Sequence, residues 1–405
     1  MTSAGPPMQL RSMRIPPCLR GDFEDLPAQQ AFDLWVEGGD VMGIVPTAAP
    51  ARGTVLSALV DAHVHLDKTY TVADVGAARG DLGAAIARSA ARRASWTPDD
   101  VRRRMARALE DAWQCGTRAM RTHLDWVSAE PPVALPVFEQ MRDLWRGRIE
   151  LQAVALVPLD LWADAPVARR IAEQVAIAAA GGTVALGAFV YRNERMQDKL
   201  GRLFALAAAH NLPLDFHVDE GLDADAVGLQ VIADLALAQP RRLRVVCGHA
   251  CSLSIQPAAQ AARTLRACDR AGIELVALPT TNLYLQGSWD GTPVERGITR
   301  LNEALELGLR PSIGSDNVAD PFYPYGSYDL FETFGLAVQL AHLAPADDWL
   351  GSITVHPAHA LGLHWNGRIA EGCPADLVCL EACSDHELLT PAGRRRRVMR
   401  QGRFL

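Results

Sequence analysis

The side chains best suited to chemistry in this sequence are histidines at the ends of apolar segments. His63 and His65 form an H-x-H motif within LVDAHVHLD. Alternate residues of a strand share one face, so both imidazoles should point to the same side. This geometry suits two ligands of one metal ion, because imidazole is a common ligand of zinc and iron. Three more histidines end apolar segments: His123, His217 and His249.

A carboxylate completes the candidate ligand set. Asp316 lies in the segment IGSDN, at the end of a short apolar stretch. His63, His65 and His217 with Asp316 supply three imidazoles and one carboxylate, and a coordination position remains for water. An isolated H-x-H is often accidental, but its combination with three other strand-end groups is not. We therefore expect one divalent metal ion per chain, zinc or iron.

Other polar residues near these ligands have candidate roles in acid–base chemistry or substrate contact. Glu220 follows His217 by three residues, where its carboxyl group can move protons to a substrate ring nitrogen. His249 could hydrogen-bond the attacking oxygen or the tetrahedral intermediate, whereas a lone buried histidine is more often part of the core. His123 is open between support of the ligands and core packing. Lys68 could contact substrate or form a salt bridge, and it is one of only two lysines.

These residues need a scaffold that brings strand ends together, and the pattern of elements predicts one. Eight short apolar segments alternate with amphipathic helical segments such as 98–114, 195–211 and 226–240. This alternation predicts a (β/α)8 barrel, whose active site lies at the carboxyl ends of the strands. A doubly wound sheet is the alternative, but no glycine-rich loop follows the first strand. The predicted strands are 59–67, 118–126, 151–160, 182–190, 212–220, 244–250, 273–282 and 309–317.

The two ends of the chain lack the alternation of strands and helices and instead contain short strand-like segments and turns. Residues 32–36 and 41–45 resemble a hairpin, and the sequence returns to short strands and turns after residue 365. We expect residues 1–57 and 365–405 to form one small β-sandwich beside a barrel of residues 58–364.

Composition narrows the function classes. The 405 residues carry a net charge of −7, so no basic field attracts nucleic acid or an anionic membrane. No apolar run approaches the about 20 residues of a membrane helix, and prolines interrupt the N-terminal segment where a signal peptide would be apolar. Eight scattered cysteines predict buried thiols. These features predict a cytoplasmic protein.

Long segments of the sequence resemble the amidohydrolase superfamily and, within it, the cytosine deaminase group. They include VDAHVHLDK, FHVDEGLD, GSDNVADPFYPYGSYDL and GRIAEGCPADLV. The resemblance implies that His63, His65, His217 and Asp316 bind the metal and that the segment GAFVYRN, which has no lysine, leaves the site mononuclear. It also implies that Glu220 protonates a ring nitrogen, that His249 orients a metal-bound hydroxide, and that Asp316 accepts a proton from the bound water. The expected reaction is hydrolysis of an exocyclic amine of a cytosine-like N-heterocycle, with release of ammonia.

Two departures from the group concern the substrate. Leu159 stands where cytosine deaminase has a glutamine that reads the pyrimidine, and Asn317 replaces a second aspartate. Asn317 and Lys68 also make the chain similar to N-isopropylammelide amidohydrolase, although that relative lacks the counterpart of Glu220. We take Lys68, Leu159, Asn317 and Phe322 as candidate substrate contacts.

Two alternatives to deamination stay open. One is hydrolysis of an N-alkylamino triazine or a cyclic amide, and the other is a non-catalytic barrel scaffold. The expected partner is a small N-heterocyclic molecule, with neither nucleic acid nor membrane, and hydrolases with this barrel often form homo-oligomers.

Overall fold

The computed structural model describes residues 7–78, 82–179 and 183–405. These residues group into two compact units. One comprises the described chain up to Asp61, Glu110–Ala119 and Asp329–Leu405, and the other the described residues of Ala62–Leu109 and Met120–Tyr328. The boundaries expected after residues 57 and 364 stay a prediction.

An eight-stranded parallel sheet provides the framework of the larger unit. Its strands neighbour one another in chain order, from β5 to β12. A parallel bridge between Val64 and Asp316 joins the first strand to the residues after the last, so the sheet is a nearly closed barrel. The predicted (β/α)8 fold is confirmed. The strands are β5 Leu59–Val64, β6 Thr117–Asp125, β7 Glu150–Pro158, β8 Val184–Val190, β9 Leu214–Val218, β10 Val245–His249, β11 Ile273–Ala277 and β12 Ser312–Ile313.

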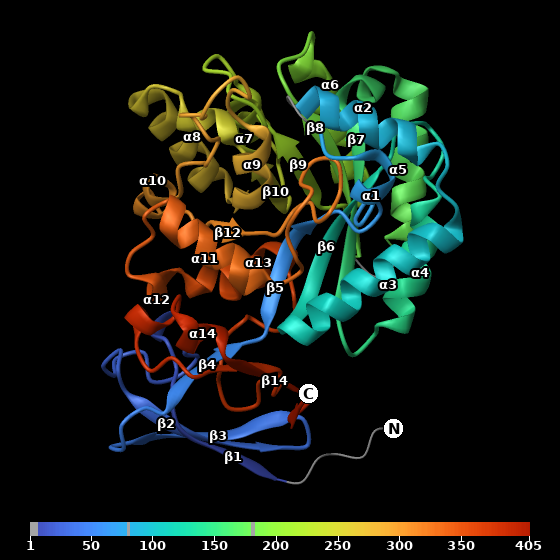
Figure 1. The fold of residues 1–405 in the computed structure, drawn as a ribbon. Coiled ribbons are helices and arrows are strands. Elements are labelled where there is room, and N and C mark those ends of the chain that lie inside the picture. The colour runs from blue at the N-terminus through green and yellow to red at the C-terminus, as the bar shows by residue number, and fades with distance from the viewer. Residues whose placement is uncertain (1–6, 79–81, 180–182) are drawn as a thin grey trace. The chain divides into compact units, whose positions relative to one another are not determined.

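Helices connect the strands and lie around the outside of the barrel (Figure 1). The segment predicted over 98–114 forms an 18-residue helix with Asp99 and Asp100 in its first turn, where carboxylates favour the helix dipole. The helices up to β12 are α1 Val72–Val75, α2 Leu82–Arg93, α3 Pro98–Cys115, α4 Ala134–Leu144, α5 Ala165–Ala178, α6 Met196–His210, α7 Gly228–Leu237, α8 Ala258–Ala271, α9 Pro279–Leu285 and α10 Leu301–Glu306, with the 3-10 turns η2 Leu159–Ala163 and η3 Cys251–Ser254.

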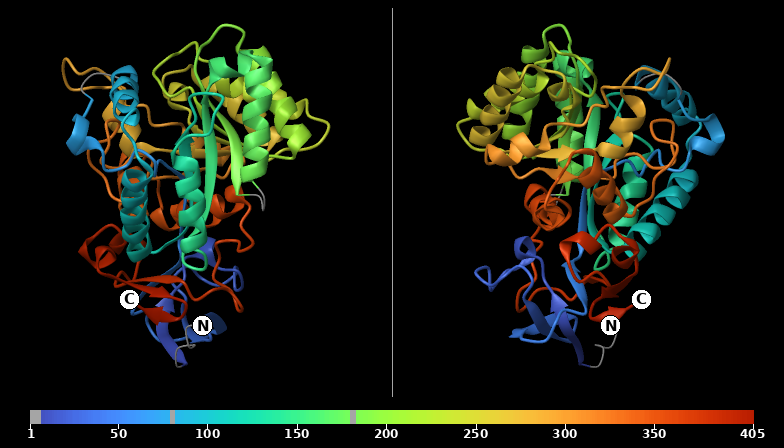
Figure 2. Two further views of the ribbon diagram at one scale, coloured as in Figure 1. Left: turned by 90° about the vertical axis from the view of Figure 1, so that its right-hand side faces the viewer. Right: turned by 60° about the vertical axis from the view of Figure 1, so that its left-hand side comes forward.

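The two ends of the chain share one seven-stranded sheet, in the order β15-β14-β13-β4-β1-β2-β3. The expected hairpin is present as β2 paired with β3, and the antiparallel pair of β4 and β13 joins the N-terminal strands to the C-terminal ones. The blue and red segments accordingly lie together in both views of Figure 2. The strands are β1 Met8–Arg14, β2 Ala31–Glu37, β3 Asp40–Thr47, β4 Gly53–Ser57, β13 Leu377–Leu380, β14 Arg396–Arg400 and β15 Arg403–Phe404.

The remaining elements are short, apart from one helix of eleven residues. None of the described helices is long and apolar enough to cross a membrane. These elements are η1 Pro17–Leu19, α11 Leu330–Leu340, α12 Ala346–Trp349, η4 Leu350–Ile353, α13 Val355–Leu361, η5 Asp385–Glu387 and α14 Pro391–Arg394.

Most of the predicted strands are shorter than expected, and the last two are shortened most. The segment 273–282 is a strand only to Ala277, because Pro279 starts helix α9, as proline often does at a first helical position. The segment 309–317 keeps a strand only at Ser312–Ile313. Of the predicted strand 182–190, Gly182 lies outside the described residues.

Candidate active site

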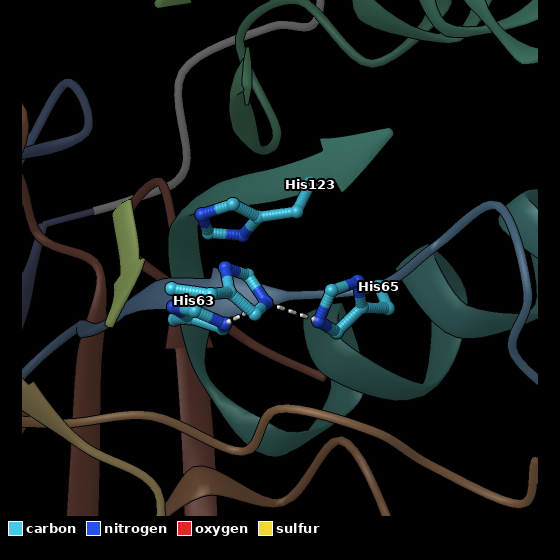
Figure 3. A group of neighbouring side chains, drawn as sticks. His63, His65 and His123 are labelled. Atoms are coloured by element: carbon cyan, nitrogen blue, oxygen red, sulfur yellow. Dashed lines mark hydrogen bonds between the residues drawn. The ribbon is translucent and has the colours of Figure 1, made fainter. Parts of the chain in front are cut away.

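The first strand of the barrel, β5, contains His63 and ends at Val64, and His65 follows directly. Every residue of β5 is buried, and His63 and His65 both point toward the other site residues. Their rings lie beside the ring of His123 from β6 (Figure 3). His217, in β9, lies between them, with its Nε2 3.2 Å from His63 Nε2 and 3.1 Å from His65 Nε2. The structure therefore brings the three predicted imidazole ligands together.

Asp316 follows β12 by three residues, and its side chain lies beside the same histidines. Its Oδ1 lies 3.2 Å from His65 Nε2 and 3.5 Å from His63 Nε2. The Asp316 amide donates to the His63 carbonyl oxygen at 2.9 Å, which fixes the backbone where the barrel closes. Asp316 and His249 have φ values of 59° and 71°. Such left-handed backbone is uncommon outside glycine and clusters at functional sites.

The chemistry of this group fits a divalent cation. Burial lowers the pKa of His63, His65 and His217 well below the usual value, with neighbouring histidines adding to the shift in all three and Lys68 adding to it in the first two. The three rings are therefore neutral, which is the form that binds metal. One ligand atom from each of His63, His217, His249 and Asp316 lies within 4.8 Å of the others, and a second such group contains His65 and His123. Neutral imidazoles with one carboxylate are the donors that zinc and iron accept.

Glu220 and His249 form a buried pair beside this cluster. His249 Nδ1 lies 3.5 Å from a Glu220 carboxyl oxygen and 3.1 Å from Asn282 Nδ2. Burial lowers the pKa of His249 to about 4, although Asp316 opposes that shift. Burial and then the charge of Asp316 raise the pKa of Glu220 well above its usual value, with Lys68 opposing. Burial thus favours the protonated form of the Glu220 carboxyl group and the neutral form of the His249 imidazole.

These groups line a cavity of about 470 Å³. Seven predicted residues line it with further apolar and aromatic side chains, whereas Leu159 does not. Leu159 is fully buried in η2, so our expectation that it contacts substrate is not supported, and Leu156 and Pro158 of β7 face the cavity instead. The predicted lining residues are His65, Lys68, His217, Glu220, His249, Asn317 and Phe322, of which His65 and His217 belong to the ligand set.

Asp320 organises the loop that brings Asn317 and Phe322 to the cavity. Asn317 Nδ2 donates to one Asp320 carboxyl oxygen at 2.6 Å. The amides of Phe322 and Tyr323 donate to the other oxygen at 2.8 and 3.1 Å. One buried carboxylate thus fixes both candidate substrate contacts.

His123 belongs to a buried polar network behind the candidate metal ligands. Its ring centroid lies 3.9 Å from that of His63. Its Nε2 lies 3.1 Å from Asp215 Oδ1, and Arg121 Nη1 donates to Asp215 Oδ2 at 2.9 Å. Of the two roles left open for His123, this contact with a carboxylate and a ligand ring favours support of the ligands.

Sequence reasoning missed several of these residues. The sequence pattern predicts Asn282 at the end of a strand, although Pro279 signals a helix start that places Asn282 beside His249. Arg93 and Asp125 also line the cavity. Arginines are abundant in this chain, so nothing in the sequence separated Arg93 from the others. Asp125 lies two residues after His123, on the same face of β6, and that spacing could have identified it.

Comparison with known proteins agrees with this geometry. The model of the amidohydrolase family matches residues 152–404. The chain is 37% identical over 385 residues to a pterin deaminase of Rhizobium rhizogenes. The aligned region covers 92% of this chain and 87% of that protein. It is 22% identical to the N-isopropylammelide isopropyl amidohydrolase of a Pseudomonas species, over 92% of this chain and 93% of that protein. Among solved structures, 5-methylcytosine deaminase of Klebsiella pneumoniae, liganded with 5-fluorocytosine, is similar with a TM-score of 0.83 and 25% identity, over 98% of this chain and 97% of that one.

Proposed function

The chain belongs to the amidohydrolase family and is a hydrolase of carbon–nitrogen bonds, and we propose that the bond it hydrolyses joins an exocyclic amine to an N-heterocyclic ring. The observation that carries this proposal is the buried Glu220–His249 pair on the cavity wall. Displacement of an amine from a C=N–NH2 carbon requires protonation of the ring nitrogen, and a carboxylic acid that keeps its proton at neutral pH can provide it.

The ligand set His63, His65, His217 and Asp316 would hold one divalent metal ion, zinc or iron. When bound, this ion supplies Lewis-acid activation of water. Its native identity is part of the proposal, as is the presence of a single ion.

Three side chains would carry out the proton transfers and orient the attacking water. Glu220 donates its proton to the ring nitrogen next to the amine-bearing carbon. His249 orients the attacking water through Nε2, since Asn282 is placed to donate to Nδ1. Asp316 accepts the proton that water loses when its oxygen bonds to the carbon, and this proton goes to the departing amine. Glu220 regains its proton from the hydroxyl group of the tetrahedral intermediate as the carbon–amine bond breaks, so the amino heterocycle and water become a ring carbonyl compound and ammonia.

Pterins are the substrates to test first. The relative at 37% identity is a pterin deaminase, and a cavity of about 470 Å³ has room for a bicyclic ring. Its walls include the apolar side chains of Leu156, Pro158 and Phe189, whereas no glutamine lines it among the described residues. A monocyclic pyrimidine would therefore leave much of this wall uncovered.

The test is ammonia release by metal-verified protein from pterin, cytosine, 5-methylcytosine and an amino-triazine, with Glu220→Gln as the inactive control. Rapid release from one compound by the wild type, lost in the variant, supports the proposal. Absence of ammonia from every compound contradicts it.

A second candidate is hydrolysis of an N-alkylamino triazine. It is favoured by Lys68 and Asn317, which both line the cavity and carry the similarity to N-isopropylammelide amidohydrolase. The product separates the two functions, because this reaction releases an alkylamine in place of ammonia.

A further inference from the structure

Two cations lie on one wall of the cavity and share a single carboxylate. Lys68 follows β5, Arg93 ends α2, and Asp125 ends β6 between them. Lys68 Nζ donates to Asp125 Oδ1 at 2.7 Å, and Arg93 Nη1 donates to Oδ2 at 2.5 Å. All three side chains line the cavity.

This wall carries an excess of positive charge. Burial lowers the pKa of Lys68, but Asp125 and Asp67 more than offset that effect, so the ammonium stays charged. Burial raises the pKa of Asp125, yet Lys68 and Arg93 bring it below its usual value, so it stays ionised. The other acid among the described lining residues is Glu220, and burial raises its pKa, which favours the uncharged form. Asp67 is fully buried behind Asp125 and does not line the cavity.

Both cations keep donors for a ligand. An ammonium has three N–H donors and a guanidinium five, and each group gives one to Asp125 in the described part of the chain. The Arg93 side chain is 23% exposed and that of Lys68 4%. Because Asp125 already holds both groups in place, binding an anion costs little further side-chain entropy.

An aromatic face lies next to the charge. Lys68 Nζ is 5.0 Å from the centre of the Phe322 ring, and Asp320 holds the amide of Phe322. A flat heterocycle that stacks on Phe322 would therefore place a ring substituent near Lys68. Glu220 and His249, the proposed reacting groups, line the same cavity. One substrate molecule can therefore contact these two groups and the Lys68–Arg93 pair at the same time.

We propose that Arg93 and Lys68 form a subsite for a carboxylate substituent on the N-heterocyclic substrate. This inference rests on the proposed deaminase function and narrows its substrate class to acidic heterocyclic amines. A guanidinium and an ammonium that converge on one carboxylate form charge-assisted hydrogen bonds, and the analogue without the acid leaves those donors unpaired.

The test compares two pairs of compounds that differ only by a carboxylate: pterin with pterin-6-carboxylic acid, and cytosine with cytosine-5-carboxylic acid. For the wild type, kcat/KM for the acid of a productive pair should exceed that for its neutral partner by about tenfold or more, the factor of one charge-assisted hydrogen bond. Arg93→Met should abolish most of this preference, and Arg93→Lys should restore part of it.

Arg92→Met is the matched control, because Arg92 is the preceding residue on α2 and bonds Asp74 and Ser95 outside the cavity. It should keep the wild-type preference. Equal or better turnover of the neutral partner by the wild type overturns the subsite, as does an unchanged preference in Arg93→Met.

If neither member of a pair releases ammonia, the deaminase proposal fails separately, and calorimetric titration of the same pairs into zinc-loaded protein decides the subsite. The acid should then bind about tenfold more tightly to the wild type, but not to Arg93→Met. Equal binding of both members overturns the inference.

Discussion

Asn282 Nδ2 lies 3.1 Å from His249 Nδ1, inside the buried cluster at the strand ends. An amide nitrogen only donates, so the Nδ1 of this neutral imidazole accepts and its proton lies on Nε2. The Nε2 atom has no hydrogen-bond partner among the described residues, which leaves its N–H available to a reactant. A residue of α9 therefore decides which nitrogen of His249 faces the chemistry.

We predict that Asn282→Asp lowers kcat about 10- to 100-fold, the usual range for a residue that orients a catalytic or ligand side chain. Aspartate has nearly the same shape but accepts a hydrogen bond, so it draws the His249 proton to Nδ1 and reverses the tautomer. The measurement is steady-state ammonia release with the best substrate. Asn282→Ala, which only removes the donor, should be less harmful. Full kcat in Asn282→Asp would show that this contact does not set the tautomer.

Glu220 should impose an alkaline limit on activity. Its pKa is raised well above the usual value, chiefly by burial, so the protonated form persists to higher pH than in an exposed glutamic acid. Because that form donates the proton, kcat should fall as pH rises through the raised pKa and should not fall as pH drops toward the usual value for glutamic acid. Glu220→Gln should lower kcat by about 100- to 10,000-fold, the contribution typical of general acid catalysis.

The pH–rate profile of the wild type is the measurement, and the exposed Glu306, at the end of α10, provides the control Glu306→Gln. A rate that instead rises across the alkaline range would assign Glu220 the role of a base.

Gly248 should be essential for the position of His63. A Cβ added to Gly248 would lie 2.7 Å from both Nδ1 and Cε1 of the His63 ring. The ring is fully buried and has little room to shift. We predict that Gly248→Ala weakens metal affinity by about 10- to 100-fold, as loss of ligand orientation usually does.

The measurement for Gly248→Ala is metal content per chain after dialysis against a chelator series. Gly201→Ala in α6 is the control, because no atom lies within 4 Å of the corresponding Cβ. Wild-type metal retention in Gly248→Ala would mean that the ring adapts.

The barrel and the convergence of the ligands were predictable, because both follow from patterns that are local in the chain. Alternation of apolar strands and amphipathic helices defined the fold, and strand-end positions placed His63, His65, His217 and Asp316 at one rim. Contacts that depend on loop geometry were not predictable. Leu159 and Leu156 are three residues apart, and only the start of η2 after Pro158 decides that Leu156 faces the cavity. Arg93 reaches the cavity through the placement of α2, which no local pattern specifies.

The network behind the ligands yields a prediction about stability. Asp215 is fully buried and joins Arg121 to His123, at 2.9 Å and 3.1 Å. Asp215→Asn would leave the guanidinium of Arg121 buried without its counter-charge, so we expect the free energy of unfolding to fall by about 3–5 kcal/mol, as for other broken buried ion pairs. Urea denaturation of the metal-free protein measures this, since it removes any contribution of ligand binding.

Asp198→Asn is the matched control, because it removes a carboxylate paired with Arg195 at 3.0 Å on the exposed surface of α6. Solvent screens that pair, so its loss should leave the urea midpoint nearly unchanged. If Asp215→Asn shifts the midpoint no more than Asp198→Asn does, then Arg121 finds another partner on losing Asp215. Gln152 is the candidate, since its Oε1 already accepts from Arg121 Nη2 at 2.7 Å. In that case His123 alone would lose its partner, and a defect would appear in metal affinity without a defect in stability.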